Sequence, residues 1–279
     1  MDWCKQTGPV THLVQLNDSP LQLDDPALLS ATSYGHFTSM QVRDGKVRGL
    51  DLHLERLDRS SRELFGHGVA PDRVLTYLRT ALASSPSADL SIRVNAFARD
   101  RSFLDGTPVE PDLLLTVTDP IEPTAEPPRL LAVEHERTAP HLKHTGTFSL
   151  THEFRRARLA GYDDALFYNR AGNVSEASIW NICFVTEDRV SWPAAEVLPG
   201  ITMLTLQAGL DALDVARETV DIPLTALGDY RAAYLTNSID PALPVASITT
   251  SAGTTQYKPD SASADLLDRA YAAIPLLAI

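Results

Sequence analysis

Residues 161–184 read GYDDALFYNRAGNVSEASIWNICF, and this stretch decides the fold of the second half of the chain. Two short segments that are typical of strands, Ala165–Tyr168 and Asn173–Ser175, flank the sequence NRAG at 169–172, which suits a tight turn. A third segment of this kind, Trp180–Val185, follows directly. The pattern therefore predicts a β-hairpin and a further strand.

Regular elements are also predicted on both sides of this stretch. Arg129–Glu134 is typical of a strand, and Ser149–Ala160 of a helix that ends at Gly161. The sequence PGIT at 199–202 leads into an amphipathic helix. The apolar positions of these two helices are Leu150, Phe154, Ala157, Leu204, Leu206, Leu210 and Leu213.

The first part of the chain predicts a smaller α/β unit. Two helices are expected, one over Asp51–Phe65 and one around residues 74–82, because leucines and other apolar residues recur there at helical spacing. Asp89–Phe97 and Asp112–Val117 are typical of strands. Four prolines lie within residues 118–128, and such a segment excludes a regular element. We therefore expect a small N-terminal domain over 1–117, a Pro-rich linker over 118–128 and a larger C-terminal α/β domain over 129–279.

Composition predicts a soluble protein of the cytoplasm. The chain has 36 acidic against 24 basic residues and a formal net charge of -12, which argues against a nucleic-acid partner. Cys4 and Cys183 are too far apart in the sequence to indicate a disulfide framework or a metal site. The first residues lack the features of a secretory signal, and no apolar run approaches the ~20 residues that span a bilayer.

Several common kinds of site have no motif in this sequence. Phosphate-loop, dinucleotide-binding, serine-hydrolase and zinc-protease motifs are all absent. Of the eight histidines, only His141 and His144 come loosely near the spacing of metal ligands. We therefore expect no metal.

Four separated segments contain the residues that could carry chemistry. They are residues 34–57, with YGHFT, VRDGKV and HLERL; 141–144, HLKH; 161–184; and 198–202, LPGIT, with TNS at 236–238. In order and approximate spacing they resemble the class IV, or fold type IV, pyridoxal 5′-phosphate (PLP) enzymes. This family includes branched-chain aminotransferase, D-amino-acid aminotransferase and aminodeoxychorismate lyase.

The resemblance implies a fold, a cofactor and partners. The expected fold is α/β of the α+β type, with two domains, PLP in the cleft between them and the cofactor-binding lysine in the C-terminal domain. Family members are usually homodimers, so a homodimer is expected here. The expected ligands are small amino acids and keto acids.

The resemblance also implies roles for individual residues. Lys143 matches the lysine that forms the Schiff base with PLP, and Glu176 matches the carboxylate that pairs with the pyridine nitrogen. Arg56 matches the arginine that contacts the phosphate, on a helix face opposite the leucines. Without the family context, Lys143 and Arg56 would be solvated surface charges, and Glu176 a solvent-facing strand residue.

Further candidates lie in loops and at a helix start. Ile201, Thr202 and Ser238 match the elements that give amides and hydroxyls to the phosphate, and a glycine turn before a helix suits an anion. Thr202 could equally be a capping residue, and Ser238 a turn residue.

The substrate side is less defined by the sequence. His36 and Thr38 in the first segment are candidate substrate ligands. Arg99 or Arg101 could bind a substrate carboxylate, and both could equally be solvated turn charges.

Three features bear on the choice of reaction. Met203 replaces an arginine that is common in the family, and Phe148 replaces a tyrosine of the branched-chain enzymes, whereas TNS at 236–238 looks more like the lyase loop. Our leading hypothesis is a PLP-dependent aminotransferase acting on a small amino acid and keto acid pair. The alternatives are a lyase-like elimination that releases pyruvate from aminodeoxychorismate, and a non-catalytic family member.

Overall fold

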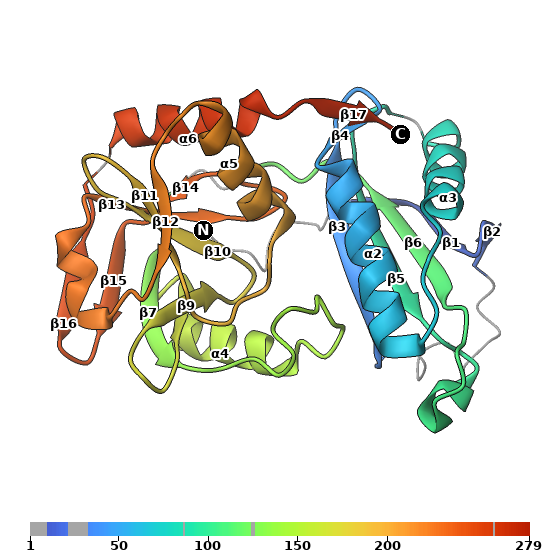
Figure 1. The fold of residues 1–279 in the computed structure, drawn as a ribbon, viewed down its shortest axis with the longest axis horizontal. Coiled ribbons are helices and arrows are strands. Elements are labelled where there is room, and N and C mark those ends of the chain that lie inside the picture. Colours follow the sequence, from blue (N-terminus) through green and yellow to red (C-terminus); the bar gives the residue numbers. More distant parts are fainter. Residues whose placement is uncertain (1–9, 22–32, 86, 124–125, 259) are drawn as a thin grey trace. The chain divides into compact units, whose positions relative to one another are not determined.

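The computed structural model describes residues 10–21, 33–85, 87–123, 126–258 and 260–279. The chain divides into two compact units (Figure 1). The first contains Met1–Glu122, Lys143–Gly146 and Leu276–Ile279, and the second contains Pro123–Leu142 and Thr147–Pro275. No helix in the described ranges is long and apolar enough to cross a membrane.

The first unit is built on a five-stranded antiparallel sheet. Two helices pack on it through a core that includes Leu57 and Leu78 of the helices and Val94 and Leu115 of the sheet. A short 3₁₀ helix, η1 (Arg101–Asp105), follows the strand that carries Val94. In sheet order the strands are β2 (Ser19–Pro20), β1 (Thr11–Leu16), β6 (Asp112–Thr118), β5 (Leu90–Phe97) and β3 (Gly35–Val42), and the helices are α2 (Leu50–Phe65) and α3 (Pro71–Ala83).

Two segments that come late in the sequence belong to the first unit. The strand β17 (Leu276–Ala278) pairs with β4 (Lys46–Arg48), and Lys143–Gly146 lies beside β3. The expected division placed both segments in the C-terminal domain. They depart from it because their backbone groups are hydrogen-bonded to strands of the first unit. The other expected boundaries stay predictions.

The second unit contains two five-stranded mixed sheets that share an apolar core. Leu130 and Leu166 of one sheet and Phe184 and Leu235 of the other belong to this core. The strands of the first sheet are, in order, β16 (Gly253–Gln256), β15 (Ser247–Thr250), β7 (Arg129–Glu134), β8 (Asp164–Tyr168) and β9 (Val174–Ala177). Those of the second sheet are β12 (Arg217–Val220), β11 (Val190–Pro193), β10 (Asn181–Val185), β13 (Ala232–Thr236) and β14 (Leu243–Pro244).

Helices cover the outer face of each of these sheets (Figure 1). The helix α4 (Phe148–Leu159) packs on β7 and β8, and α5 (Ile201–Ala212) and α6 (Ser261–Ala273) pack together on the other sheet. A 3₁₀ helix, η2 (Leu224–Asp229), precedes β13. The unit is thus layered as helix, sheet, sheet and helices, which is a mixed α/β arrangement as expected.

The predicted hairpin is confirmed. β8 and β9 are antiparallel, and the turn between them is closed by a hydrogen bond from the amide of Asn169 to the carbonyl of Asn173 (2.9 Å). Gly172 adopts φ 82°, a left-handed conformation that glycine adopts without strain. The turn therefore brings Glu176 onto β9, where the residue is buried.

Two details of the helices differ from the periodic pattern. Leu213 was expected on the apolar face of α5, but the helix ends at Ala212 and Leu213 is 39% exposed. Without the family context, Arg56 on the polar face of α2 would be a solvated charge, yet His53 and Arg56 are only 2% and 5% exposed. They are buried because the strand β3 and its neighbours cover that face as well.

Candidate active site

Lys143 is held by the backbone of β3. Its carbonyl accepts a hydrogen bond from the amide of Phe37 (2.9 Å), and the amide of Thr145 donates to the carbonyl of Gly35 (2.8 Å). The side chain is half-buried, and its Nζ lies 5.0 Å from the centroid of the Phe37 ring. The amine is therefore placed by a regular strand of the first unit and rests against an aromatic face.

Arg56 belongs to a buried polar group in the same unit. Its guanidinium donates to the hydroxyl of Thr38, and the same hydroxyl lies 2.6 Å from Nδ1 of His53. The Nε of Arg56 is buried and has no hydrogen-bond partner. Burial, with a smaller contribution from the charge of Arg59, lowers the pKa of Arg56 to about 9. A cation that is buried with an unused donor is poised to bind an anion.

The two histidines of this region are held neutral by burial. The Nε2 of His36 lies 2.8 Å from the hydroxyl of Ser61, and burial followed by the charge of Arg56 lowers the pKa of His36 to about 4. Burial, Arg56 and Lys143, in that order, lower the pKa of His53 well below its ordinary value. His36 and Thr38 thus both contact α2, and their role in substrate binding stays a prediction.

The arginines near the end of β5 differ in their surroundings. Arg99 makes a two-pronged ion pair with Asp112, with both N–O distances 2.9 Å, and Arg101 is exposed on η1. The guanidinium of Arg93, which was not a candidate, stacks over the Phe37 ring at 3.7 Å from its centroid. Arg93 and Lys143 thus both lie against Phe37. In the sequence, Arg93 is the one charged residue in the apolar strand β5, and this interruption could have indicated Arg93 as a candidate.

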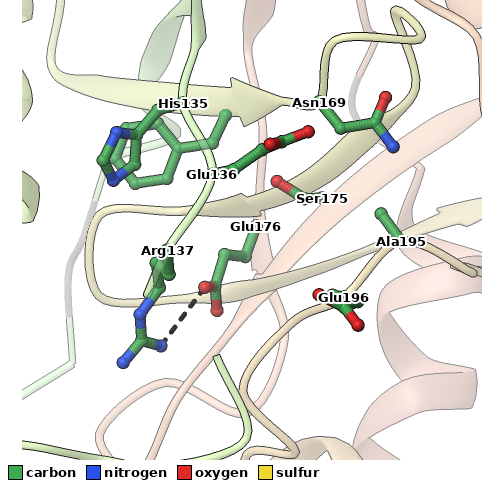
Figure 2. A pocket seen from close by; sticks show the side chains of 9 residues that line it. His135, Glu136, Arg137, Asn169, Ser175, Glu176, Ala195 and Glu196 are labelled. Carbon is green, nitrogen blue, oxygen red and sulfur yellow. Dashed lines mark hydrogen bonds and ion pairs between the residues drawn. The ribbon is translucent and has the colours of Figure 1, made fainter. Parts of the chain in front are cut away.

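In the second unit Glu176 forms a buried ion pair that the sequence did not predict. Nη1 of Arg137 donates to Oε1 of Glu176 at 3.2 Å, and the two side chains are 6% and 7% exposed (Figure 2). The amide of Leu198 donates to Oε2 of Glu176 at 3.3 Å. The Glu176 side chain is therefore not the solvent-facing residue that its hairpin position alone suggests.

The candidate anion-binding turn before α5 is hydrogen-bonded to Glu176 through the amide of Leu198. Asn181 donates from Nδ2 to the carbonyl of Leu198 (2.8 Å) and so fixes the turn before α5. The first helical hydrogen bond of α5 is donated by Leu204 to Gly200 (2.9 Å), so the amides of residues 201–203 precede it, and Ile201 and Thr202 are buried. Such amides, at the positive end of a helix dipole, suit an anion.

The loop after β13 contributes one clear feature. Asn237 accepts hydrogen bonds from the amides of Ile239 (2.7 Å) and Asp240 (3.0 Å), and this holds the loop in which Ser238 is half-buried. The hydroxyl of Thr236, directly before it, is buried without a hydrogen-bond partner. Thr236 was quoted with the motif but not named as a ligand, and its unused hydroxyl adds it to the candidates.

Two departures from the family pattern have a structural account. Met203 packs against the apolar cluster around α5 and α6, so a thioether in a hydrophobic contact stands where relatives carry a charge. Phe148 is 81% exposed and stacks on His152 one turn later in α4. Among the described residues there is no group of three or more side chains that could hold a metal ion.

Comparisons with known proteins agree with this arrangement of elements. A model of the family described as amino-transferase class IV matches residues 35–248. Among curated protein sequences no relative matches the chain.

Several solved structures share the fold. A branched-chain aminotransferase from Thermoproteus uzoniensis has a TM-score of 0.79 and 20% identity, over 94% of each chain. A putative 4-amino-4-deoxychorismate lyase from Legionella pneumophila has a TM-score of 0.75 and 20% identity, over 90% of this chain and 94% of that one. A hypothetical aminotransferase from Mycobacterium tuberculosis has a TM-score of 0.75 and 19% identity, over 95% and 99%. Because the family model spans well over half of the chain, this protein belongs to the class IV aminotransferases.

Proposed function

We propose that this protein is a PLP-dependent aminotransferase that acts on a small amino acid and keto acid pair and binds its cofactor through Lys143. Similar structures support the cofactor, since one branched-chain aminotransferase is in its PLP form and another contains pyridoxamine 5′-phosphate. The substrate class is supported by a similar aminotransferase with norvaline and by another with α-ketoglutarate.

The observation that carries this proposal is the pairing of an amine with an unused buried cation in one unit. Lys143 and Arg56 both belong to the first unit, and the charge of Lys143 contributes to the lowered pKa of His53, a neighbour of Arg56 through Thr38. PLP carries an aldehyde and a phosphate, so its two ends fit an amine and a guanidinium. The unpartnered Nε of Arg56 is the donor that a phosphate oxygen satisfies.

The second unit supplies groups that suit the rest of the cofactor. Glu176 is an ionisable acceptor that fits a protonated ring nitrogen, and the amides of Ile201 and Thr202 fit phosphate oxygens. We propose that Ser238 and Thr236 add hydroxyl donors. When bound, PLP withdraws electrons from the substrate Cα and so makes its proton removable.

Lys143 has two tasks in this proposal. Its Nζ would hold the cofactor at rest, and as a free, neutral amine it would accept the proton from the substrate Cα and return it to another carbon. The Nζ lies 5.0 Å from the centroid of the Phe37 ring, and the ring limits contact of the amine with water on that side. Burial keeps His36 and His53 neutral, so neither histidine adds a positive charge beside Lys143 and Arg56.

Spectroscopy tests the proposal directly. PLP-loaded protein is expected to show a visible absorption band, and borohydride is expected to fix the cofactor on Lys143. Incubation with a panel of L- and D-amino acids is expected to convert the band to that of the pyridoxamine form. If no amino acid causes this conversion, transamination is wrong, and a label on another lysine contradicts the assignment of Lys143.

Elimination is the second candidate, and one observation favours it. The sequence TNS at 236–238 looks more like the lyase loop, and a putative aminodeoxychorismate lyase is among the structures that share the fold. Pyruvate released from aminodeoxychorismate without any keto acid acceptor supports the lyase over the aminotransferase. Absence of any band after addition of PLP, unchanged by Lys143→Ala, supports a non-catalytic member instead.

A homodimer is part of the same proposal. Sedimentation of the PLP-loaded protein is expected to give twice the mass of the 30.4 kDa chain. A monomer at micromolar concentration contradicts it.

A further inference from the structure

The ion pair between Arg137 and Glu176 joins three segments of the second unit. Besides its bond to Glu176, the guanidinium donates from Nη2 to the carbonyl of Leu142 at 3.0 Å. Leu142 directly precedes Lys143 in the chain, and Leu198, which donates to the other oxygen of Glu176, directly precedes the turn that begins α5. Arg137 thus connects the backbone next to the proposed cofactor lysine to the carboxylate proposed for the ring nitrogen.

Burial makes this pairing necessary. A carboxylate that is 7% exposed takes up a proton unless a nearby positive charge or hydrogen-bond donors stabilise its ionised form. The pair lines a cavity of about 310 Å³ that is also lined by Glu136 and Glu196 (Figure 2). Of the described residues that line it, Arg137 is the one with a permanent positive charge. Its charge, 3.2 Å from Glu176, therefore favours the ionised form of this carboxylate among other acidic groups.

The orientation of Arg137 is itself fixed. One Nη is bonded to Glu176 and the other to the carbonyl of Leu142, while Nε is buried without a hydrogen-bond partner. A planar guanidinium can reach both acceptors at once, whereas a lysine ammonium is a point charge on a flexible stem. The arrangement thus depends on the fork of the arginine as well as on its charge.

We propose that Arg137 is a positioning residue that holds Glu176 ionised and correctly aimed for the ring nitrogen of the cofactor. This inference rests on the proposed function. Arg137 acts through Glu176 and touches neither cofactor nor substrate. Its loss is therefore expected to matter chiefly while residue 176 is a glutamate, because only the bond to the Leu142 carbonyl is independent of Glu176.

A double-mutant cycle on PLP binding tests this dependence. The affinity of cofactor-free protein for PLP and the absorption maximum of the bound cofactor are measured for wild type, Arg137→Met, Glu176→Gln and the double variant. Arg137→Met and Glu176→Gln are each expected to weaken binding about tenfold or more, as expected for hydrogen bonds to charged groups, and to shift the absorption maximum. The double variant is expected to match Glu176→Gln within about twofold in affinity.

Two further variants complete the experiment. Arg137→Lys is expected to recover part of the affinity and of the absorption maximum, because it restores the charge but not both hydrogen bonds. Arg170→Met removes an arginine whose side chain is 85% exposed in the same unit and is expected to change nothing. If Arg137→Met does not fold, the double variant, which leaves no unpaired buried charge, still gives the comparison with Glu176→Gln.

The outcomes separate this inference from the proposed function. If wild type binds PLP at Lys143 and the losses of the two single variants multiply in the double variant, Arg137 acts independently of Glu176 and the inference is wrong. An Arg137→Met variant with wild-type affinity and spectrum overturns it as well. If wild type forms no borohydride-reducible bond to PLP, the proposed function and this inference both fail.

Discussion

Replacing Arg56 by methionine is expected to leave the cofactor-free protein at least as stable as wild type. Burial lowers the pKa of Arg56 from 12.5 to about 9, and at about 1.4 kcal/mol per pKa unit the buried charge costs the empty fold about 5 kcal/mol. Methionine has a similar length and removes this cost. Thr38 and His53 still bond to each other, so no partner is left unsatisfied.

The expected change can be read as a melting temperature. The lost bond from Arg56 to Thr38 offsets part of the gain, so we expect a net gain of about 2–3.5 kcal/mol, given that a hydrogen bond from a charged group contributes about 1.5–3 kcal/mol. Each kcal/mol shifts Tm by about 2–4 °C in domains of 150–250 residues. Thermal unfolding of the cofactor-free Arg56→Met variant is therefore expected at a temperature a few degrees higher.

PLP reverses the order of the two proteins. In the proposed function Arg56 binds the phosphate, so the variant would lack these charge-assisted hydrogen bonds, and two bonds of about 1.5–3 kcal/mol each correspond to a loss of affinity of about 100-fold or more. Saturating PLP is thus expected to raise the Tm of wild type and to raise that of the variant much less. Arg62→Met is the matched control, because Arg62 is on the same helix, is 66% exposed and lies 2.9 Å from Asp58. Unchanged PLP affinity, or a cofactor-free Arg56→Met protein that melts well below wild type, would refute the reasoning.

Three further predictions concern stability. The pKa of His36 is about 4 in the folded protein against 6.5 when unfolded, so the unfolded chain binds more protons between these values. The stability of the first unit is therefore expected to fall by up to about 3 kcal/mol as pH falls from 6.5 to 4. Hydrogen exchange at pH 7 and 4.5 checks this, and a His36→Gln variant that loses as much stability in acid contradicts it. The pKa of Asp164 is raised from 3.8 to about 6, mainly by burial, so its ionisation costs up to about 3 kcal/mol of stability as pH rises from 4 to 6. Asp164→Asn is expected to be more stable than wild type at pH 7 but not at pH 4. The same difference in stability between variant and wild type at both pH values rules this out. A Cβ on Gly209 collides with the backbone of Ala270, so Gly209→Ala is expected to lower the free energy of unfolding in denaturant by about 1–3 kcal/mol. Gly228→Ala, whose Cβ meets nothing within 4 Å, is the control, and equal effects of the two substitutions contradict the packing argument.

The parts of the fold that could be predicted from sequence are those set by neighbours in the chain. The strands of the hairpin, its turn and the strand Asn181–Val185 follow from residues within about ten positions of one another. The start of α5 follows in the same way from the sequence PGIT, since a glycine turn before an apolar period is a local signal. The extra segments of the first unit could not be predicted, because the pairing of β17 with β4 joins residues more than two hundred positions apart.

The candidate site shows the same limit in its electrostatics. Arg56 and Glu176 could be named from motifs, but their burial could not, since a polar residue opposite an apolar stripe is exposed unless a second element covers it. Arg137 lies in an irregular segment, and its partner is 39 positions later, so only the packed structure joins them. No sequence motif marks Arg137, because its contact with Glu176 exists only in the folded chain. The positioning role proposed for Arg137 and the unused donor of Arg56 therefore both depend on burial, which only the packed structure reveals.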